Sequence, residues 1–473
     1  MNASTRNLAD CTATELLHLF RTGQASPVEA TQAVLARIAE FDRTLNAFCL
    51  VDADRALASA KKSEARWHNG APIDLLDGVP VSIKDLILTR GWPTLRGSRT
   101  IDPAQAWDID APATARLREA GAVLLGKTNT PEFGIKGTTD NLLTGITRNP
   151  WNTKMTPGGS SGGAAAAVAS GMGPLAVGTD GAGSIRIPST FCGIPGIKPS
   201  FGRVPAFPLS PFGTVAHVGP HARSVEDLAL MLTVLSRPDA RDWTSLPYDP
   251  RDYRVGLADG VRGLRVAYSP DLGYVKDVDP EIAAAVRRAA ESFTALGAQV
   301  DELAPGFANP EEITTKLWFV GASTIIGNLA PEQVALTDPA LRWQADEGRK
   351  VSVPELQRLA ARRAELGTFM RQFHERYDLL LTPGVSVSAF EAKAPDRWQL
   401  ALDTFLGWTP FSYPFNLTQQ PAAVVPCGLT RSGLPISLQI VGPMHADALV
   451  LRAARAYEST REWTLPVAPK NPV

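Results

Sequence analysis

The stretch from Thr156 to Ser200 constrains the fold more than any other part of the chain. It reads TPGGSSGGAAAAVASGMGPLAVGTDGAGSIRIPSTFCGIPGIKPS and carries no charged side chain before Asp180. Residues this small and uncharged predict a buried helix followed by a buried strand, because buried charges are costly. The glycines around Ser160 and Ser184 permit tight turns and close approach of other groups. The stretch therefore predicts two turns, each presenting a serine hydroxyl.

Length and charge limit the kind of protein this can be. A chain of 473 residues can form one large α/β domain or two domains. With 47 basic and 48 acidic residues, a nucleic-acid or anionic-membrane partner has no electrostatic support. The uncharged run is interrupted by Pro157 and Pro174 and is too weakly apolar to span a bilayer. We therefore expect neither a nucleic-acid nor a membrane partner.

The cysteines and the N-terminus indicate a cytoplasmic protein. The chain has four cysteines, far apart and without a CxxC pair. This pattern argues against a disulfide framework and suits a reducing compartment. The first ten residues, MNASTRNLAD, lack the apolar segment of a signal peptide.

Helix and strand patterns alternate along the chain and predict α/β architecture. Capping boxes at residues 12–15 and 26–29 begin two helices, and an alanine-rich helix covers 52–68. Predicted helices at 112–120, 164–170 and 281–296 each precede an apolar strand, at 122–127, 175–179 and 299–303. Further strands are expected at 79–83, 264–268, 379–382, 422–426 and 436–441. We predict a central mixed β-sheet flanked by helices on both faces.

Two irregular regions interrupt this alternation. Residues 238–259 are rich in Pro, Asp and Arg and indicate a surface connection. Residues 318–343 and 398–415 concentrate aromatic side chains and prolines, with an amphipathic helix at 353–377 between them. We expect one domain over residues 1–473, with a variable, substrate-facing lobe at about 273–407.

Common catalytic patterns are absent from the sequence. The six histidines are scattered, and Gly219 and Pro220 exclude a regular helix face between His217 and His221. Gly158–Gly162 fits G-x-S-x-G around Ser160, but no apolar strand leads into it, so a Ser-His-Asp triad is not expected. The glycine run lacks the lysine of a phosphate-binding loop. We predict no metal and no cofactor.

A hydroxyl nucleophile without histidine needs another base, and Lys84 is the candidate. It ends the apolar strand at 79–83 rather than lying in a charged run. Desolvation there would lower its pKa enough to populate the neutral amine. Taken alone, Lys84 also fits a surface lysine at a strand end.

Several motifs in a fixed order together resemble the amidase signature family. GGSSGG at 158–163 precedes GTDGAGSIR at 178–186, and GVPVSIKD lies upstream at 78–85. GKTNTPEFG at 126–134, CGIPGIKPSFGRVP at 192–205 and the pair QPAAVVPCG and GLPISLQIVG at 420–442 complete the set. The resemblance covers about residues 10–460 and implies that family's fold, with a signature core at about 70–225.

The resemblance implies a catalytic role for three residues. Ser184 matches the acylated nucleophile, Ser160 the intermediate serine after a cis peptide bond, and Lys84 the terminal base. Neutral Lys84 would accept the Ser160 proton while Ser160 takes the Ser184 proton during attack on a carbonyl.

The surrounding positions would support this relay. The N–H groups of an oxyanion hole would come from Gly181, Ala182, Gly183 and Ser184. Ser161 would orient the relay, with simple helix capping as the alternative, and Asp180 and Arg186 would brace the turn. Ala182 departs from the family, which usually has glycine there.

The predicted activity is hydrolysis of amide-type C–N bonds in a small molecule: an amide, anilide or carbamate (urethane). Candidate pocket residues are Thr130, Phe133, Trp318 and Phe319, and the other aromatics of the two aromatic regions (Trp343, Phe405, Trp408, Phe411 and Tyr413) fit a pocket or core packing equally. The alternative is a glutaminase subunit of a tRNA-dependent amidotransferase, which needs a partner protein. A non-catalytic scaffold is the third hypothesis. A homodimer is one option for assembly.

Overall fold

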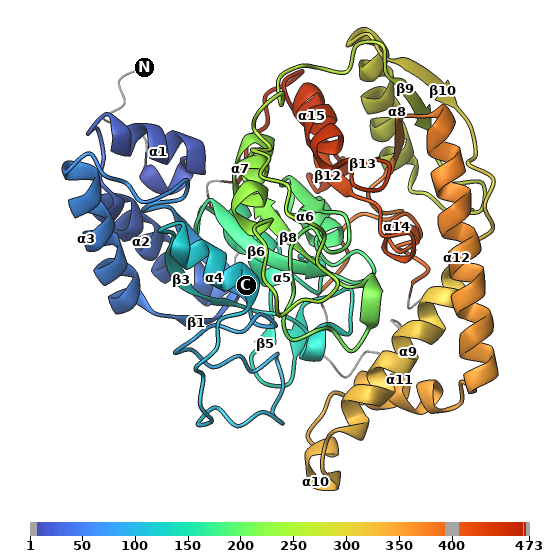
Figure 1. Cartoon of the computed structure of the whole chain (residues 1–473), viewed down its shortest axis with the longest axis horizontal. Helices are drawn as coiled ribbons and strands as arrows, with labels where there is room; N and C mark the ends of the chain where they lie inside the picture. The colour runs from blue at the N-terminus through green and yellow to red at the C-terminus, as the bar shows by residue number, and fades with distance from the viewer. Residues whose placement is uncertain (1–6, 393–405, 467, 470–473) are drawn as a thin grey trace.

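The computed structural model describes residues 7–392, 406–466 and 468–469, and its centre is an 11-stranded sheet (Figure 1). The strand order is β1-β3-β2-β6-β8-β7-β12-β13-β11-β9-β10. The strands are Phe48–Val51 (β1), Pro80–Lys84 (β2), Val123–Thr128 (β3), Leu175–Asp180 (β6), Gly196–Lys198 (β7), His217–Ala222 (β8), Arg265–Tyr268 (β9), Gln299–Glu302 (β10), Leu379–Pro383 (β11), Ala422–Leu429 (β12) and Pro435–Val441 (β13). A separate two-stranded sheet joins Asp140–Asn141 (β4) to Gly145–Ile146 (β5).

The main sheet is mixed, as predicted. β2 runs parallel to both β3 and β6, and β9 runs parallel to both β10 and β11. The centre is antiparallel, because β6 pairs with β8 and β12 pairs with both β7 and β13.

Helices cover both faces of this sheet. They are Ala13–Arg21 (α1), Pro27–Leu45 (α2), Ala53–His68 (α3), Pro112–Glu119 (α4), Gly162–Ala169 (α5), Arg186–Cys192 (α6), Val225–Leu235 (α7), Pro280–Ala295 (α8), Glu311–Gly327 (α9), Pro331–Val334 (α10), Pro339–Arg349 (α11), Val353–Arg376 (α12), Pro414–Leu417 (α14) and Asp447–Glu458 (α15). Side chains of β3 separate the two layers, because successive strand residues point to opposite faces. Leu124 packs in the core with α4 and α7, whereas Val123 and Leu125 pack with α2, α3 and α5.

The predicted helices and strands are present, with ends shifted by a few residues. Both N-terminal capping boxes form: Thr12 with Glu15 begins α1, and Ser26 with Glu29 begins α2. Every residue of α5 is buried, which explains its run of Gly and Ala. Residues 238–259 contain no helix or strand, as the composition indicated.

Several elements carry no clear sequence signal. β7 and β8 read GIK and HVGPHA, with few of the β-branched and aromatic residues that favour strands. His217 and His221 both lie on β8, which agrees with the expected absence of a helix between them. The first turn of α6 directly follows the GAGS turn, so the glycines obscure its beginning.

Helices α9, α11 and α12 lie together on the side of the molecule opposite α1–α3, with α10 projecting beyond them (Figure 1). α8, β10 and β11, although inside the predicted lobe at 273–407, belong to the main sheet and its cover. Lys136 Nζ joins this lobe to the core, since it lies 2.8 Å from Asp338 Oδ2 at the start of α11 and 2.5 Å from Asp140 Oδ2.

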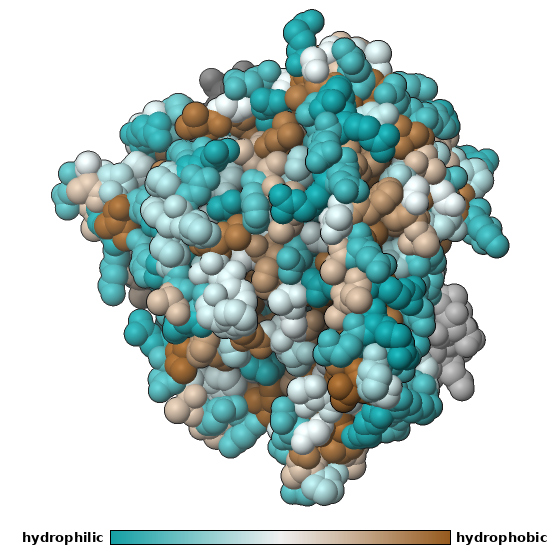
Figure 2. All heavy atoms as spheres, turned by 45° about the vertical axis from the view of Figure 1, so that its right-hand side comes forward, coloured by the Kyte–Doolittle hydropathy of each residue, from teal (hydrophilic) through white to brown (hydrophobic). Residues whose placement is uncertain are grey.

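On the face shown in Figure 2, hydrophobic residues are interspersed among hydrophilic ones. Among the described residues, no helix combines the length and the apolar character needed to cross a membrane.

Candidate active site

Lys84, at the end of β2, lies fully buried among three hydroxyl groups. Its Nζ atom is 2.6 Å from Ser160 Oγ, 2.9 Å from Ser161 Oγ and 2.8 Å from Thr179 Oγ1. The two serines come from the beginning of α5, and the threonine comes from β6, which pairs with β2. The surface alternative for Lys84 is therefore wrong.

Burial lowers the pKa of Lys84 well below that of an ordinary lysine, although the charge of Asp180 acts in the opposite direction. The side chains in direct contact with its amine are hydroxyls, which compensate an ammonium charge less than a carboxylate does. The site therefore favours the neutral amine, which can accept a proton.

Ser160 and Ser161 lie where the chain enters α5. The peptide bond between Gly159 and Ser160 is cis, as the family resemblance implies. Ser161 Oγ donates to the Thr179 carbonyl at 3.1 Å and accepts the Thr179 N–H at 3.2 Å. It makes no capping hydrogen bond to α5, so the capping alternative is wrong. Its hydroxyl instead contacts Lys84 and β6.

The turn that carries Ser184 is organised by Asp180. Its carboxylate accepts the N–H of Gly183 at 2.7 Å and that of Ile185 at 3.1 Å. Arg186 donates to both carboxylate oxygens at 3.0 Å, and neither side chain is exposed. Burial alone would raise the pKa of Asp180, but the charge and hydrogen bonds of Arg186 hold it below its usual value. This geometry fits the bracing role proposed for both residues.

One predicted oxyanion-hole donor is wrong. The N–H of Gly183 is already used by Asp180, which closes the turn on itself three residues later. Within the described residues, the N–H groups of Gly181, Ala182 and Ser184 have no hydrogen-bond partner. Of the four expected oxyanion-hole donors, these three remain candidates.

Two further contacts hold the turn in place. Ser412 Oγ donates to the Ala182 carbonyl at 2.6 Å, and Ser161 N–H donates to the Ser184 carbonyl at 3.2 Å. Gly183 has φ +132, and a Cβ there would lie 2.5 Å from Ser412 Oγ, so only glycine fits. At position 182 the structure accommodates the methyl group of alanine.

Ser160 and Ser184 open into one cavity of about 790 Å³. Gly181 and Thr179 lie beside them in its wall, and the rest of the wall is mainly apolar. Phe212 and Trp318 stack there with ring centroids 3.9 Å apart. A Cβ on Gly181 would meet the Trp318 ring at 2.8 Å, so this indole lies against the oxyanion turn.

Of the four candidate pocket residues, the cavity wall contains Phe133 and Trp318 but not Thr130 or Phe319. The Thr130 hydroxyl donates to the Pro131 carbonyl, away from the cavity. Phe319 follows Trp318 on α9 and so points about 100° away. It packs against Trp343, with ring centroids 5.0 Å apart.

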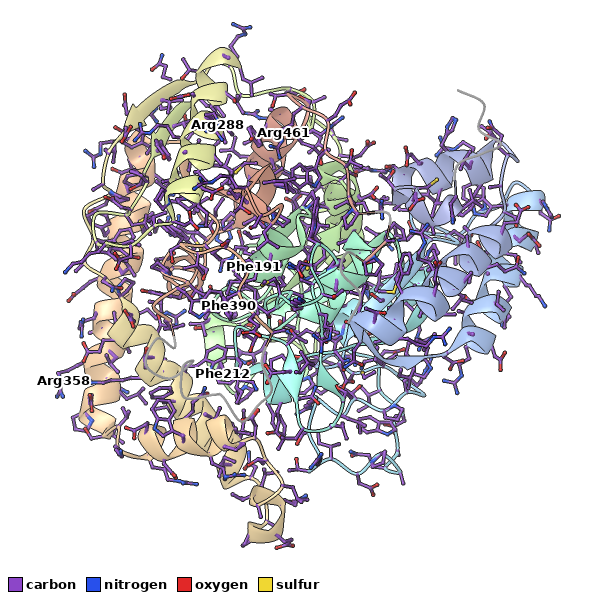
Figure 3. The ribbon with its side chains drawn as sticks, turned by 180° about the vertical axis from the view of Figure 1, so that it is seen from behind. Phe191, Phe212, Arg288, Arg358, Phe390 and Arg461 are labelled. Atoms are coloured by element: carbon purple, nitrogen blue, oxygen red, sulfur yellow. The ribbon has the colours of Figure 1, made fainter. Side chains whose placement is uncertain are left out.

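The other aromatic candidates belong to packing clusters. Trp408 stacks on Phe191 at 5.8 Å, and Phe191 meets Phe390 edge-on. Figure 3 labels Phe191 and Phe390 near the middle of the molecule. Phe411 and Tyr413 are fully buried. Phe405 lies outside the described residues.

Thr179, Phe212 and Ser412 were missed by the sequence interpretation. Thr179 had an available signal, because it stands in GTD directly before Asp180 on the strand beside Lys84. Phe212 and Ser412 had none, since their contacts bring together segments far apart in the sequence. Among the described residues, no cluster of three or more His, Cys, Asp or Glu side chains could hold a metal ion.

Comparison with known proteins identifies similar chains over nearly the whole length. A family model described as Amidase matches residues 29–451. The chain is 38% identical over 465 residues to an acylamidase of Rhodococcus erythropolis, covering 97% of each chain. It is 35% identical over 499 residues to a glutamyl-tRNA(Gln) amidotransferase subunit of Myxococcus xanthus, covering 98% of this chain and 99% of that one.

Solved structures match over nearly the full length. A bacterial aryl acylamidase of the amidase signature enzymes superposes with a TM-score of 0.89 at 33% identity, covering 96% of this chain and 97% of that one. The 6-aminohexanoate cyclic dimer hydrolase superposes with a TM-score of 0.88 at 30% identity, covering 98% and 99%.

Proposed function

Because the chain belongs to the amidase signature family, whose enzymes hydrolyse amides, we propose that it cleaves small-molecule anilides, aryl amides and carbamates through Ser184, Ser160 and Lys84. The observation that carries this proposal is the 2.6 Å contact between the buried Lys84 amine and Ser160 Oγ, beside the turn of Ser184. A buried neutral lysine aimed at a serine supplies the base that a histidine supplies elsewhere.

The contacts of Lys84 support an assignment of its hydrogens. A neutral amine has two N–H bonds and one lone pair, and three oxygens surround it. Ser161 already donates its proton to the Thr179 carbonyl, so its oxygen accepts one amine hydrogen. Thr179 Oγ1 accepts the second. The lone pair is then left for the proton of Ser160.

The reaction follows from this assignment. Lys84 takes the Ser160 proton while Ser160 takes the Ser184 proton, and Ser184 Oγ attacks the amide carbon. The N–H groups of Gly181, Ala182 and Ser184 stabilise the oxyanion. The relay returns a proton to the leaving nitrogen, and the C–N bond breaks. Water then attacks the acyl-serine and gives a proton to the relay. The relay returns this proton to Ser184 Oγ as the acyl–oxygen bond breaks, which releases a carboxylic acid or, from a carbamate, a carbonic acid half-ester.

The cavity supports substrates with an aromatic or apolar body. Its wall is mainly apolar, and the stacked Phe212 and Trp318 lie beside the oxyanion turn. Flat rings bind well against such pairs. The likeness to an acylamidase and an aryl acylamidase points to the same substrate class. Carbamates share the carbonyl carbon and planar nitrogen that Ser184 would attack.

The test is amine release from a panel of anilides, aryl amides and aryl carbamates. We expect wild-type turnover and a loss of at least about 1,000-fold in kcat for Ser184→Ala and Lys84→Met. Ser432→Ala, at an exposed position, is the matched control and should retain full activity. A fluorophosphonate probe should label the wild-type protein and not Ser184→Ala. Undiminished turnover by Ser184→Ala would refute the mechanism.

A glutaminase that works with a partner protein is the second candidate, favoured by the 35% identity to glutamyl-tRNA(Gln) amidotransferase subunits. The apolar wall weighs against it, because free glutamine carries two charges and a polar side chain. Ammonia release from glutamine that appears only when a partner protein is added, together with inactivity on every anilide, would favour this function instead.

A further inference from the structure

One cationic side chain, Arg96, lines the mainly apolar cavity. Among the described residues of the wall, the formally charged ones are Arg96 and Asp242. An ionised group in an apolar wall is costly unless a partner compensates it. We therefore compare the protein contacts of Asp242 with those of Arg96.

Asp242 is fully engaged within the protein. Oδ1 accepts the N–H of Thr244 at 2.8 Å and its hydroxyl at 2.6 Å, and Oδ2 accepts the N–H of Ala206 at 2.8 Å. These bonds connect the loops that carry residues 205–216 and 242–244 over the cavity. Asp242 therefore has a structural role and offers little to a ligand.

Arg96 has no such partner. Across the described residues, its guanidinium forms no hydrogen bond and no ion pair. The nearby Asp85 carboxylate already accepts the N–H of Gly97 at 3.4 Å and lies 3.5 Å from Lys127 Nζ. Burial lowers the pKa of Arg96, and the charge of Asp85 opposes this. The half-buried guanidinium keeps its donors for a ligand.

The backbone attaches Arg96 to the segment that lies beside Ser160. Arg96 has φ +56, in the left-handed region, and Gly97 follows with φ +62. A non-glycine residue in this region is strained, so the surroundings must enforce it. The Arg96 carbonyl accepts the Phe133 N–H at 2.8 Å, and a Cβ on Gly134 would lie 3.3 Å from Ser160 Oγ. Arg96 is thus attached to the segment that contacts Ser160.

We propose that Arg96 is a specificity-determining residue that binds a carboxylate on the substrate. The inference rests on the proposed amidase function and narrows its substrates to amides with an aromatic or apolar body and one carboxylate. A planar guanidinium binds a carboxylate through two parallel hydrogen bonds. A substrate ammonium finds no free carboxylate in the described wall, so free amino acids such as glutamine are poor ligands.

The test compares acidic and neutral members of two substrate pairs. N-phenylglutaramic acid is paired with N-phenylbutanamide, and 4-acetamidobenzoate with acetanilide, which places the carboxylate on the acyl or the amine side. In at least one pair we expect kcat/KM to favour the acid by about 10- to 100-fold. Arg96→Gln should reduce that ratio to near one, mainly through a higher KM for the acid, and Arg96→Lys should retain part of it.

Arg99→Gln is the matched control, because Arg99 is exposed and does not line the cavity, and it should keep the wild-type ratio. An equal effect of Arg96→Gln on both members of each pair, or no preference for the acid in wild type, overturns the inference. Calorimetry with Ser184→Ala measures the binding of N-phenylglutaramic acid and of N-phenylbutanamide without cleavage. It therefore separates failure of this inference from failure of the proposed function. Suppose that wild type cleaves neither substrate. Tighter binding of the acid than of the neutral amide, lost in Arg96→Gln, still supports the inference, and equal binding of the two refutes it.

Discussion

Two buried lysines show how immediate neighbours decide the charge of an amine. Lys84 has hydroxyl groups around Nζ, and burial lowers its pKa. Lys136 is also buried, but the carboxylates of Asp140 and Asp338 outweigh burial and raise its pKa. Burial alone therefore does not fix the direction of a lysine's pKa shift. Lys84 contacts hydroxyl groups instead of carboxylates, so the effect of burial prevails there.

The rate of hydrolysis should depend on the protonation of Lys84. Its lowered pKa means that the neutral, active form persists far below the pKa of an ordinary lysine. For an anilide, we expect log(kcat/KM) to fall with a slope of about one at acid pH and to become level well below the pKa of an ordinary lysine. A rate that keeps rising up to about pH 10 would contradict this assignment of the base.

The same shift predicts how stability changes with pH. Between the folded pKa of Lys84 and its unfolded value, the unfolded chain binds more protons, so its contribution to the free energy of unfolding rises with pH. Lys84→Met lacks this term. We therefore expect Lys84→Met to be more stable than wild type near neutral pH, by a margin that shrinks towards about pH 10. Urea unfolding at several pH values measures this, and a margin independent of pH would contradict it.

Thr179 should act as a positioning residue for the base. In the proposed hydrogen assignment, it accepts an amine hydrogen of Lys84 and leaves the lone pair for the proton of Ser160. Thr179→Val keeps the shape and removes the acceptor, so we expect kcat to fall about 10-fold with a smaller change in KM. Thr179→Ser should restore most of the rate. Equal losses in Thr179→Val and Thr179→Ser would indicate a packing role.

At the scale of elements, the nucleophile turn is rigid because β6 ends in Asp180 and α6 begins with Arg186. The side chains of these two residues meet beneath the turn between them. Arg186 also donates to the Ser412 carbonyl, Gln439 and Asn416, which connects the turn to β13 and α14. The turn therefore keeps its shape before substrate binds, which is what an oxyanion site requires.

Asp180→Asn should disrupt this arrangement without changing its size. The change removes a buried negative charge and leaves Arg186 uncompensated, so the free energy of unfolding should fall by about 3–5 kcal/mol. The N–H of Gly183 also loses a charged acceptor, and kcat should fall with it. Denaturant unfolding and anilide kinetics measure both effects. Asp346→Asn, in an exposed ion pair with Arg349, is the control and should cost less than about 1 kcal/mol.

At the scale of the whole molecule, the α9–α12 lobe completes the cavity from outside the core motifs. α9 supplies Trp318 and Ile325 to the wall, and α12 lies on the outer side, where Arg358 projects away from the protein (Figure 3). The lobe attaches to the segment that contacts Ser160, because Glu132 accepts the N–H of Asp338 at 2.5 Å and Lys136 contacts the Asp338 carboxylate. The division into a signature core and a variable lobe stays a prediction.

Lys136→Met should therefore loosen the lobe. It leaves the buried Asp140 and Asp338 without their cation, so we expect a loss of about 3–5 kcal/mol in the free energy of unfolding. KM should rise more than kcat falls, because α9 lines the cavity but does not carry the reacting groups. Lys316→Met is the matched control, since its ion pairs with Glu312 and Glu355 are partly exposed to solvent and should contribute less than about 1 kcal/mol each. A Lys136→Met protein as stable as Lys316→Met would contradict the attachment.

The sequence by itself determined the order of helices and strands, the small-residue stretch that becomes α5 and β6, and the identity of Ser160, Ser184 and Lys84 as candidates. These follow from local rules: periodicity, capping and the conformational freedom of glycine. The motif order added the family and with it the roles of the candidates. All of these features can be recognised without knowing which distant segments of the chain lie together in the fold.

Only the tertiary structure decided how the candidates are used. The Asp180 carboxylate bends back to the Gly183 N–H, which removes one oxyanion donor. Phe212 and Trp318 stack from segments far apart in the chain, whereas Phe319, one residue further on α9, packs elsewhere. Strands β2 and β6 and helix α5 enclose Lys84 with hydroxyl groups, which makes it the candidate base. Hydrogen bonding, ring packing and desolvation depend on distances in space, and these distances exist only once the chain has folded.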